Sequence, residues 1–63
     1  MTLYKIYYRE IGKPKHGIWL SEGTWFVEIP DKYGRKKAAM AREEFYRVHG
    51  RENYEIIRVV KEA

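Results

Sequence analysis

Residues 2–10, TLYKIYYRE, alternate between two sets of side chains with a period of two. One side of this stretch carries Tyr4, Ile6 and Tyr8, and the other carries Leu3, Lys5, Tyr7 and Arg9. A period of two is typical of a β-strand, because successive side chains of a strand point to opposite faces of its sheet. Residues 11–17, IGKPKHG, then interrupt regular structure with two glycines and a proline, which predicts an exposed basic loop.

Residues 18–29, IWLSEGTWFVEI, fit two interpretations. They form either one irregular strand or a hairpin whose turn consists of Ser21, Glu22 and Gly23, with the glycine at a position of positive φ. In both interpretations the second half is a strand that places Trp25, Val27 and Ile29 on one face.

The strand is expected to end at Pro30 and Asp31, which open a turn through Gly34. From Arg35 the period changes to three and four, which predicts a helix of about 15 residues. Its apolar stripe consists of Ala38, Ala41, Phe45 and Val48. We expect Gly50 to end the helix as a cap in the left-handed αL conformation.

Residues 53–62, NYEIIRVVKE, return to the composition of a strand. Simple alternation places Ile56 and Val60 on one face and Ile57 and Val59 on the other. A strand that is apolar on both faces is usually central in its sheet, so we expect this one to be central.

The order of strand, one or two strands, helix and strand predicts an α+β fold within a single small domain that covers residues 1–63. We expect a three- or four-stranded antiparallel or mixed sheet, with the helix packed on one face. A chain of 63 residues buries only about 60% of the surface that it exposes when unfolded, so its core should be thin.

The composition limits the choice of partners and compartment. A net charge of +4 favours anionic partners. No stretch approaches the roughly 20 consecutive apolar residues of a membrane-spanning helix, so we expect a soluble, cytoplasmic protein. Asn53 is the only side-chain amide and 35% of residues are charged, a bias typical of proteins from hot environments.

Few residues are available for catalysis. Ser21 lies in the predicted turn, and the two histidines, His16 and His49, are far apart in the sequence. Their pattern does not match a nucleophile with a base, or a zinc site, and there is no cysteine. His49 in the last helical turn is explained by its favourable interaction with the helix dipole. We therefore expect no enzyme activity, no metal and no cofactor.

Three consecutive cations, Arg35, Lys36 and Lys37, fall in the first predicted helical turn, where the helix dipole disfavours positive charge. They form either a solvated basic turn with Asp31 capping nearby or a site for an anion. Further cations for such a site come from the first loop and are Lys13, Lys15 and His16.

Aromatic residues make up 16% of the chain and concentrate in the predicted strands. Because one helix covers only one face of the sheet, some of these rings should remain on the uncovered face. We expect there Tyr7, Phe26 and Trp19, together with Lys5, Arg9 and Arg58. Such a face suits the stacking of single-stranded bases or a protein interface rich in Tyr, Trp and Arg, and it is otherwise part of an aromatic-rich core.

The strand WFVEIP, the helix AAMAREEFY and the closing YEIIRV are similar to segments of small phage and mobile-element proteins built as β-β-α-β. This group includes an inhibitor of bacterial RNA polymerase from a short-tailed coliphage. The resemblance covers about 35 residues, and Arg58 occupies the position at which a matching arginine is expected. It implies a viral or phage accessory protein that docks on host transcription machinery, with RNA polymerase as the first candidate.

The sequence thus predicts a binding module without enzyme activity. The alternative is a nucleic-acid-binding protein that uses the cations of the helix start for phosphate and the aromatic residues of the sheet for bases. A homodimer, joined through sheet edges or through the uncovered aromatic face, is compatible with both functions.

Overall fold

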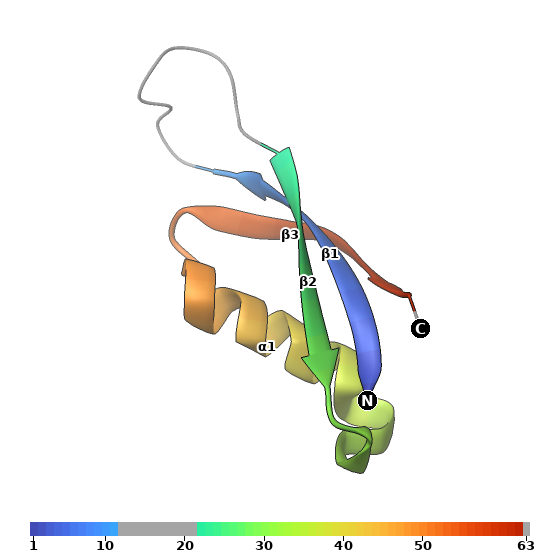
Figure 1. Cartoon of the computed structure of the whole chain (residues 1–63). Helices are drawn as coiled ribbons and strands as arrows, with labels where there is room; N and C mark the ends of the chain where they lie inside the picture. Colours follow the sequence, from blue (N-terminus) through green and yellow to red (C-terminus); the bar gives the residue numbers. More distant parts are fainter. Residues whose placement is uncertain (12–21, 63) are drawn as a thin grey trace.

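The computed structural model describes residues 1–11 and 22–62. In chain order the elements are β1 (Thr2–Glu10), β2 (Glu22–Ile29), a 3-10 segment η1 (Asp31–Lys36), α1 (Lys37–His49) and β3 (Tyr54–Lys61). The three strands form one sheet in the order β2-β1-β3, and α1 lies across one face of it (Figure 1). The predicted α+β fold with a single helix is confirmed.

Both outer strands run antiparallel to β1, so β2 and β3 are parallel to each other. Parallel strands need a long connection, and η1 with α1 provides it. The connection passes over β1 and leaves that strand in the middle. The expectation that residues 53–62 form the central strand is therefore wrong, because strand order follows from the connections and not from the apolar character of one strand.

The core lies between the sheet and α1. Its fully or nearly fully buried apolar residues are Tyr4, Ile6, Ile29, Ala41 and Phe45. Phe45 is completely buried at the centre of an aromatic cluster, in which its ring contacts Tyr8, Trp25, Tyr46, His49 and Tyr54. A core this small therefore depends on aromatic rings that come from every regular element of the fold.

The buried row of α1 differs from the predicted stripe. Ala41 and Phe45 are buried as expected, but Ala38 is exposed and Val48 is 54% exposed. The row continues in steps of four to His49, whose ring stacks on that of Phe45 with centroids 4.2 Å apart. Residues spaced four apart on a helix form a row that is inclined to the helix axis. Such a row can face the sheet along its whole length when the helix crosses the sheet obliquely.

The possible turn at Ser21, Glu22 and Gly23 is also wrong for its two described residues. Glu22 and Gly23 belong to β2 and pair with Arg9 and Tyr8 of β1. Gly23 has no positive φ. Glycine instead leaves room for the Tyr8 side chain, because a Cβ atom built at Gly23 would lie 2.7 Å from the Tyr8 hydroxyl oxygen. The strand assignment and the shared face of Trp25, Val27 and Ile29 are confirmed.

An irregularity in β3 changes the predicted faces of that strand. Tyr7 pairs with Arg58 and Tyr8 with Ile56, so Ile57 has no partner in β1. The extra residue is a β-bulge, and it reverses the alternation that follows it. As a result Ile56 and Val59 both pack against the core, and Val60 pairs with Lys5 on the other side.

The two predicted glycine positions have positive φ. Gly34 interrupts η1 with φ of 52°, as the expected turn requires. Gly50 follows α1 with φ of 89° and ψ of 144°, which lies outside the αL region that we expected. Its N–H nevertheless donates to the Tyr46 carbonyl, 2.8 Å away, and so closes the last helical turn.

Candidate functional site

The face of the sheet opposite α1 remains uncovered by any described residue, and we refer to it as the open face. It is formed by the side chains that alternate with the core residues: Leu3, Lys5, Tyr7 and Arg9 of β1, Glu22, Thr24, Phe26 and Glu28 of β2, and Glu55, Arg58 and Val60 of β3. The sequence predicted this face and five of its members correctly, namely Lys5, Tyr7, Arg9, Phe26 and Arg58. Phe26 is 52% exposed there, which is unusual for so large an apolar side chain.

Two cations and two aromatic rings meet at the centre of the open face. The Lys5 ammonium lies 4.9 Å from the ring centre of Tyr7 and 5.7 Å from that of Phe26. The Arg58 guanidinium lies 4.4 Å from the ring centre of Tyr7. All three distances are in the range of cation–π attraction. We refer to these four residues as the Tyr7 cluster.

The cluster also affects the Tyr7 hydroxyl. Its interaction with the Lys5 side chain, and secondly with that of Arg58, holds the pKa of the Tyr7 hydroxyl below its ordinary value. The half-buried phenol thus lies close to two positive charges. A partner that brings a carboxylate or a carbonyl oxygen to this point would meet hydrogen-bond donors of both cations.

The open face as a whole carries balanced charge. Its three cations, Lys5, Arg9 and Arg58, face three acids, Glu22, Glu28 and Glu55. Arg9 and Glu55 pair directly with each other. The excess of positive charge lies elsewhere, since residues 31–53 contain seven cations and four acids.

The three cations at the helix start separate into two groups. Lys37 is the first residue of α1, and its ammonium donates to the Thr2 hydroxyl at 2.9 Å and to an Asp31 carboxylate oxygen at 3.4 Å. Arg35 and Lys36 precede the first helical turn, contrary to our expectation, and both are exposed. The anion that offsets Lys37 is therefore a carboxylate of the chain itself.

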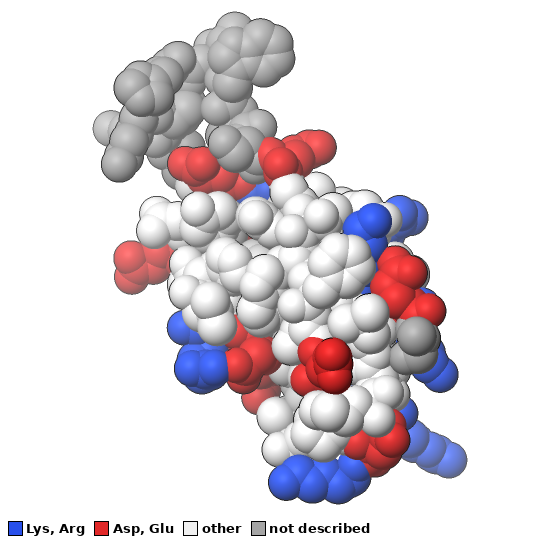
Figure 2. Space-filling view, in the orientation of Figure 1, with Lys and Arg blue, Asp and Glu red and all other residues white. Residues whose placement is uncertain are grey.

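The helix start and the Tyr7 cluster are on opposite sides of the sheet. Thr2, which contacts Lys37, is on the core side of β1, whereas Tyr7 is on the open side. Figure 2 shows Lys and Arg side chains at the lower end of the molecule, where Figure 1 places η1, and also on both sides of the view. The cations of the helix start and the aromatic residues of the sheet therefore do not form one continuous surface.

The surroundings of Asp31 predict that the stability of the fold depends on pH in the acid range. The Met1 ammonium, then the Thr2 hydroxyl and Lys37, hold the pKa of the Asp31 carboxyl below its ordinary value. A carboxyl whose pKa is lower in the folded state stabilises the fold above its ordinary pKa, and this contribution is lost as the pH falls through the lowered value. We expect the melting temperature of Asp31→Asn to fall less than that of the parent protein between pH 5 and pH 2.

The matched control for that measurement is Glu28→Gln, which removes the same charge from an exposed strand position without an ion pair among the described residues. Melting curves of the three proteins over the acid range test the prediction. If Asp31→Asn and the parent protein lose stability in parallel, the network of Thr2, Asp31 and Lys37 has no role in the fold.

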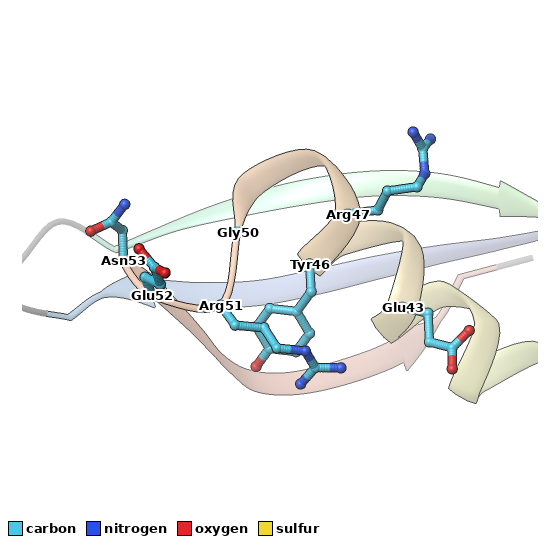
Figure 3. A pocket seen from close by; sticks show the side chains of 7 residues that line it. All are labelled: Glu43, Tyr46, Arg47, Gly50, Arg51, Glu52 and Asn53. Carbon is cyan, nitrogen blue, oxygen red and sulfur yellow. The ribbon is translucent and has the colours of Figure 1, made fainter.

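A shallow hollow of about 500 Å³ lies where α1 passes into β3. Its floor is the ring of Tyr46, and the Arg51 guanidinium lies 4.3 Å from the centre of that ring (Figure 3). The Tyr46 hydroxyl accepts a hydrogen bond from the Ile56 N–H, 3.1 Å away. Two arginines and two glutamates line the hollow, so it favours neither sign of charge. Tyr46 thus has a structural role at the edge of β3.

Several predicted residues lie outside the described part of the chain, namely Lys13, Lys15, His16, Trp19 and Ser21. His49, the described histidine, donates from Nδ1 to the Phe45 carbonyl at 3.0 Å and packs among aromatic rings. Among residues 1–11 and 22–62, no group of three metal-ligating side chains comes together. In the same residues, no helix has the length and apolar character to cross a membrane.

Sequence reasoning missed two features of the surface. The contacts of Thr2 with Asp31 and Lys37 join residues that are far apart in the chain, and no local pattern signals them. The stacking of Arg51 on Tyr46 was also missed. Here the sequence does contain a signal, namely an arginine five residues after a tyrosine at a helix end.

Comparison with known proteins found no matching family model, no similar curated protein and no similar solved structure.

Proposed function

We propose that this chain is a binding module without enzyme activity, and that it docks on another protein through the open face. The observation that carries this proposal is the Tyr7 cluster, in which the exposed ring of Phe26, the half-buried ring of Tyr7 and two cations lie together on a face that α1 leaves uncovered. Tyr, Phe and Arg side chains at the centre of such a face are typical of the residues that dominate protein interfaces.

The charge of the open face favours a protein over a nucleic acid. Binding of a phosphate backbone rests on a local excess of Lys and Arg. The open face has equal numbers of cations and acids, and its acids Glu22, Glu28 and Glu55 surround the aromatic residues. A protein surface with an apolar centre and a carboxylate placed to meet Lys5 or Arg58 fits this arrangement better.

The resemblance of WFVEIP, AAMAREEFY and YEIIRV to small phage proteins supports one class of partner. We propose host transcription machinery, with RNA polymerase as the first candidate, for a viral or phage accessory protein that acts in the cytoplasm. Arg58 belongs both to that resemblance and to the Tyr7 cluster, so it is the residue at which the two arguments meet.

The test is capture of host proteins on the immobilised chain after nuclease treatment, followed by titration of the purified partner. We expect Tyr7→Ala and Arg58→Ala each to weaken the affinity by 30-fold or more, since interface hot spots contribute at least about 2 kcal/mol. Val48→Ala is the control, because it removes an exposed apolar side chain from the outer side of α1, away from the open face. Equal loss in the control variant, or none in the other two, would contradict the proposal.

Nucleic-acid binding is the second candidate, and one observation favours it: Arg35 and Lys36 are exposed and have no carboxylate partner among the described residues. The double variant Arg35→Glu/Lys36→Glu tests it while leaving Lys37 in place. If single-stranded oligonucleotides bind with a steep salt dependence that this variant removes, the chain is a nucleic-acid-binding protein. If the variant binds the captured protein as the parent does, the open face is sufficient.

A further inference from the structure

The two outer strands of the sheet differ in how well their free edges are protected. Sheet edges present unpaired backbone groups to other chains, and bulges or covering side chains usually block them. In β3 the bulge at Ile57 interrupts the edge, and the Tyr46 hydroxyl already accepts the Ile56 N–H. Described residues therefore occupy or distort the middle of this edge.

Among the described residues, the edge of β2 has neither a bulge nor a side chain hydrogen-bonded to its backbone. All eight residues from Glu22 to Ile29 pair with β1 in one unbroken register, and no strand among the described residues pairs with the other side of β2. The exposed large apolar side chain of β2 is that of Phe26. A regular, eight-residue edge with an exposed aromatic residue at its middle is a template for the addition of another strand.

The sequence of β2 suits pairing with a second copy of itself in one register. In a two-fold antiparallel pair, directly opposed residues lie on the same face of the sheet. Because side chains alternate between the faces, the allowed registers differ from one another by steps of two residues. With Phe26 opposite Phe26, Trp25 faces Val27 and Thr24 faces Glu28 of the partner, and no like charges are opposed. A shift by two in one direction opposes Glu22 to Glu28 twice, and a shift in the other direction opposes Phe26 to Glu28.

We propose that the chain forms a homodimer through antiparallel pairing of β2 with β2 of a second copy, with Phe26 on the two-fold axis. The product is a continuous six-stranded sheet in the order β3-β1-β2-β2-β1-β3. The two helices lie on one side of it, and the two open faces join on the other side around the paired Phe26 rings. Aromatic pairs of this kind across neighbouring strands stabilise sheets.

A cysteine introduced on the axis tests the geometry, because the chain has no cysteine of its own. Directly opposed side chains in an antiparallel pair have Cβ atoms about 4.5–5.5 Å apart, close to the separation that a disulfide needs. Under mild oxidation we expect Phe26→Cys to give a disulfide-linked dimer, at a rate at least about tenfold above that of Ile57→Cys. Ile57 is the matched control, since it is 51% exposed on the protected edge.

Charge variants test the register by sedimentation at protein concentrations up to about 0.5 mM, which a small interface requires. Phe26→Lys should make the protein monomeric, because it opposes two cations on the axis. Thr24→Lys should strengthen the dimer roughly 2- to 30-fold, because each added lysine faces Glu28 of the other copy. Circular dichroism checks that both variants keep the fold.

A mass that stays monomeric over the whole concentration range would overturn the dimer, as would equal crosslinking of Ile57→Cys and Phe26→Cys. Weaker association of Thr24→Lys would overturn the register. These measurements use the purified chain alone, so they do not depend on the proposed protein partner.

Discussion

Replacement of Phe45 by alanine should destabilise the protein by about 3–5 kcal/mol, which is enough to unfold a domain of this size. Phe45 has no exposed surface and contacts five aromatic or imidazole rings from all the strands and from α1 itself. Removal of the ring leaves a cavity that these rigid neighbours fill only in part. Thermal or urea unfolding followed by circular dichroism measures the loss.

Val48→Ala is the control on the same helix. Val48 belonged to the apolar stripe that the sequence predicted, but it is 54% exposed. Its replacement should therefore change the free energy of unfolding by less than about 0.5 kcal/mol. Similar losses for Val48→Ala and Phe45→Ala would mean that α1 presents a different face to the sheet from the one described.

Gly23→Ala should cost about 1–3 kcal/mol, although alanine is ordinarily tolerated in a strand better than glycine. The added Cβ atom would lie 2.7 Å from the Tyr8 hydroxyl oxygen and 2.8 Å from the ring carbon that carries it. Tyr8 is held by its contacts with Phe45, His49 and Tyr54, so its ring has little room to withdraw. Equilibrium unfolding in urea measures the cost.

A double-mutant cycle separates this clash from a general effect on β2. In a Tyr8→Leu background the atoms nearest to Gly23 are gone, so Gly23→Ala should there be neutral or slightly stabilising. Thr24→Ala, at the next position and on the open face, should change stability by no more than about 0.5 kcal/mol. An equal cost of Gly23→Ala in both backgrounds would show that the contact with Tyr8 is not its cause.

The candidate site was predictable in its residues but not in its arrangement. Strict alternation in β1 was sufficient to place Lys5 and Tyr7 away from the core, and the same reasoning placed Phe26. Alternation failed in β3, where one extra residue reverses the faces and brings Arg58 opposite Tyr7. The Tyr7 cluster therefore depends on a β-bulge that no local sequence pattern predicted.

The cations of the helix start show a second limit of prediction from the sequence. The sequence predicted that Arg35, Lys36 and Lys37 all fall in the first helical turn, but only Lys37 does, and Asp31 lies near it as the sequence suggested. The sequence could not show that Thr2, which pairs with Ile29 at the end of β2 next to Asp31, joins Asp31 in holding Lys37. That contact requires β1 and β2 to be paired and η1 to fold back beside them.

Local patterns in the sequence were enough to predict most of the elements: β1 and the second half of β2 from a period of two, β3 from its strand composition, α1 from steps of three and four, and the turns from Pro30, Gly34 and Gly50. These features are local, because backbone geometry and side-chain direction act over a few residues. The tertiary structure was needed to show that β1 is central, that the row of Ala41, Phe45 and the partly buried His49 faces the sheet, and that the edge of β2 is regular and unpaired among the described residues. Those choices depend on contacts between distant segments, and their free energy depends on how the whole chain packs.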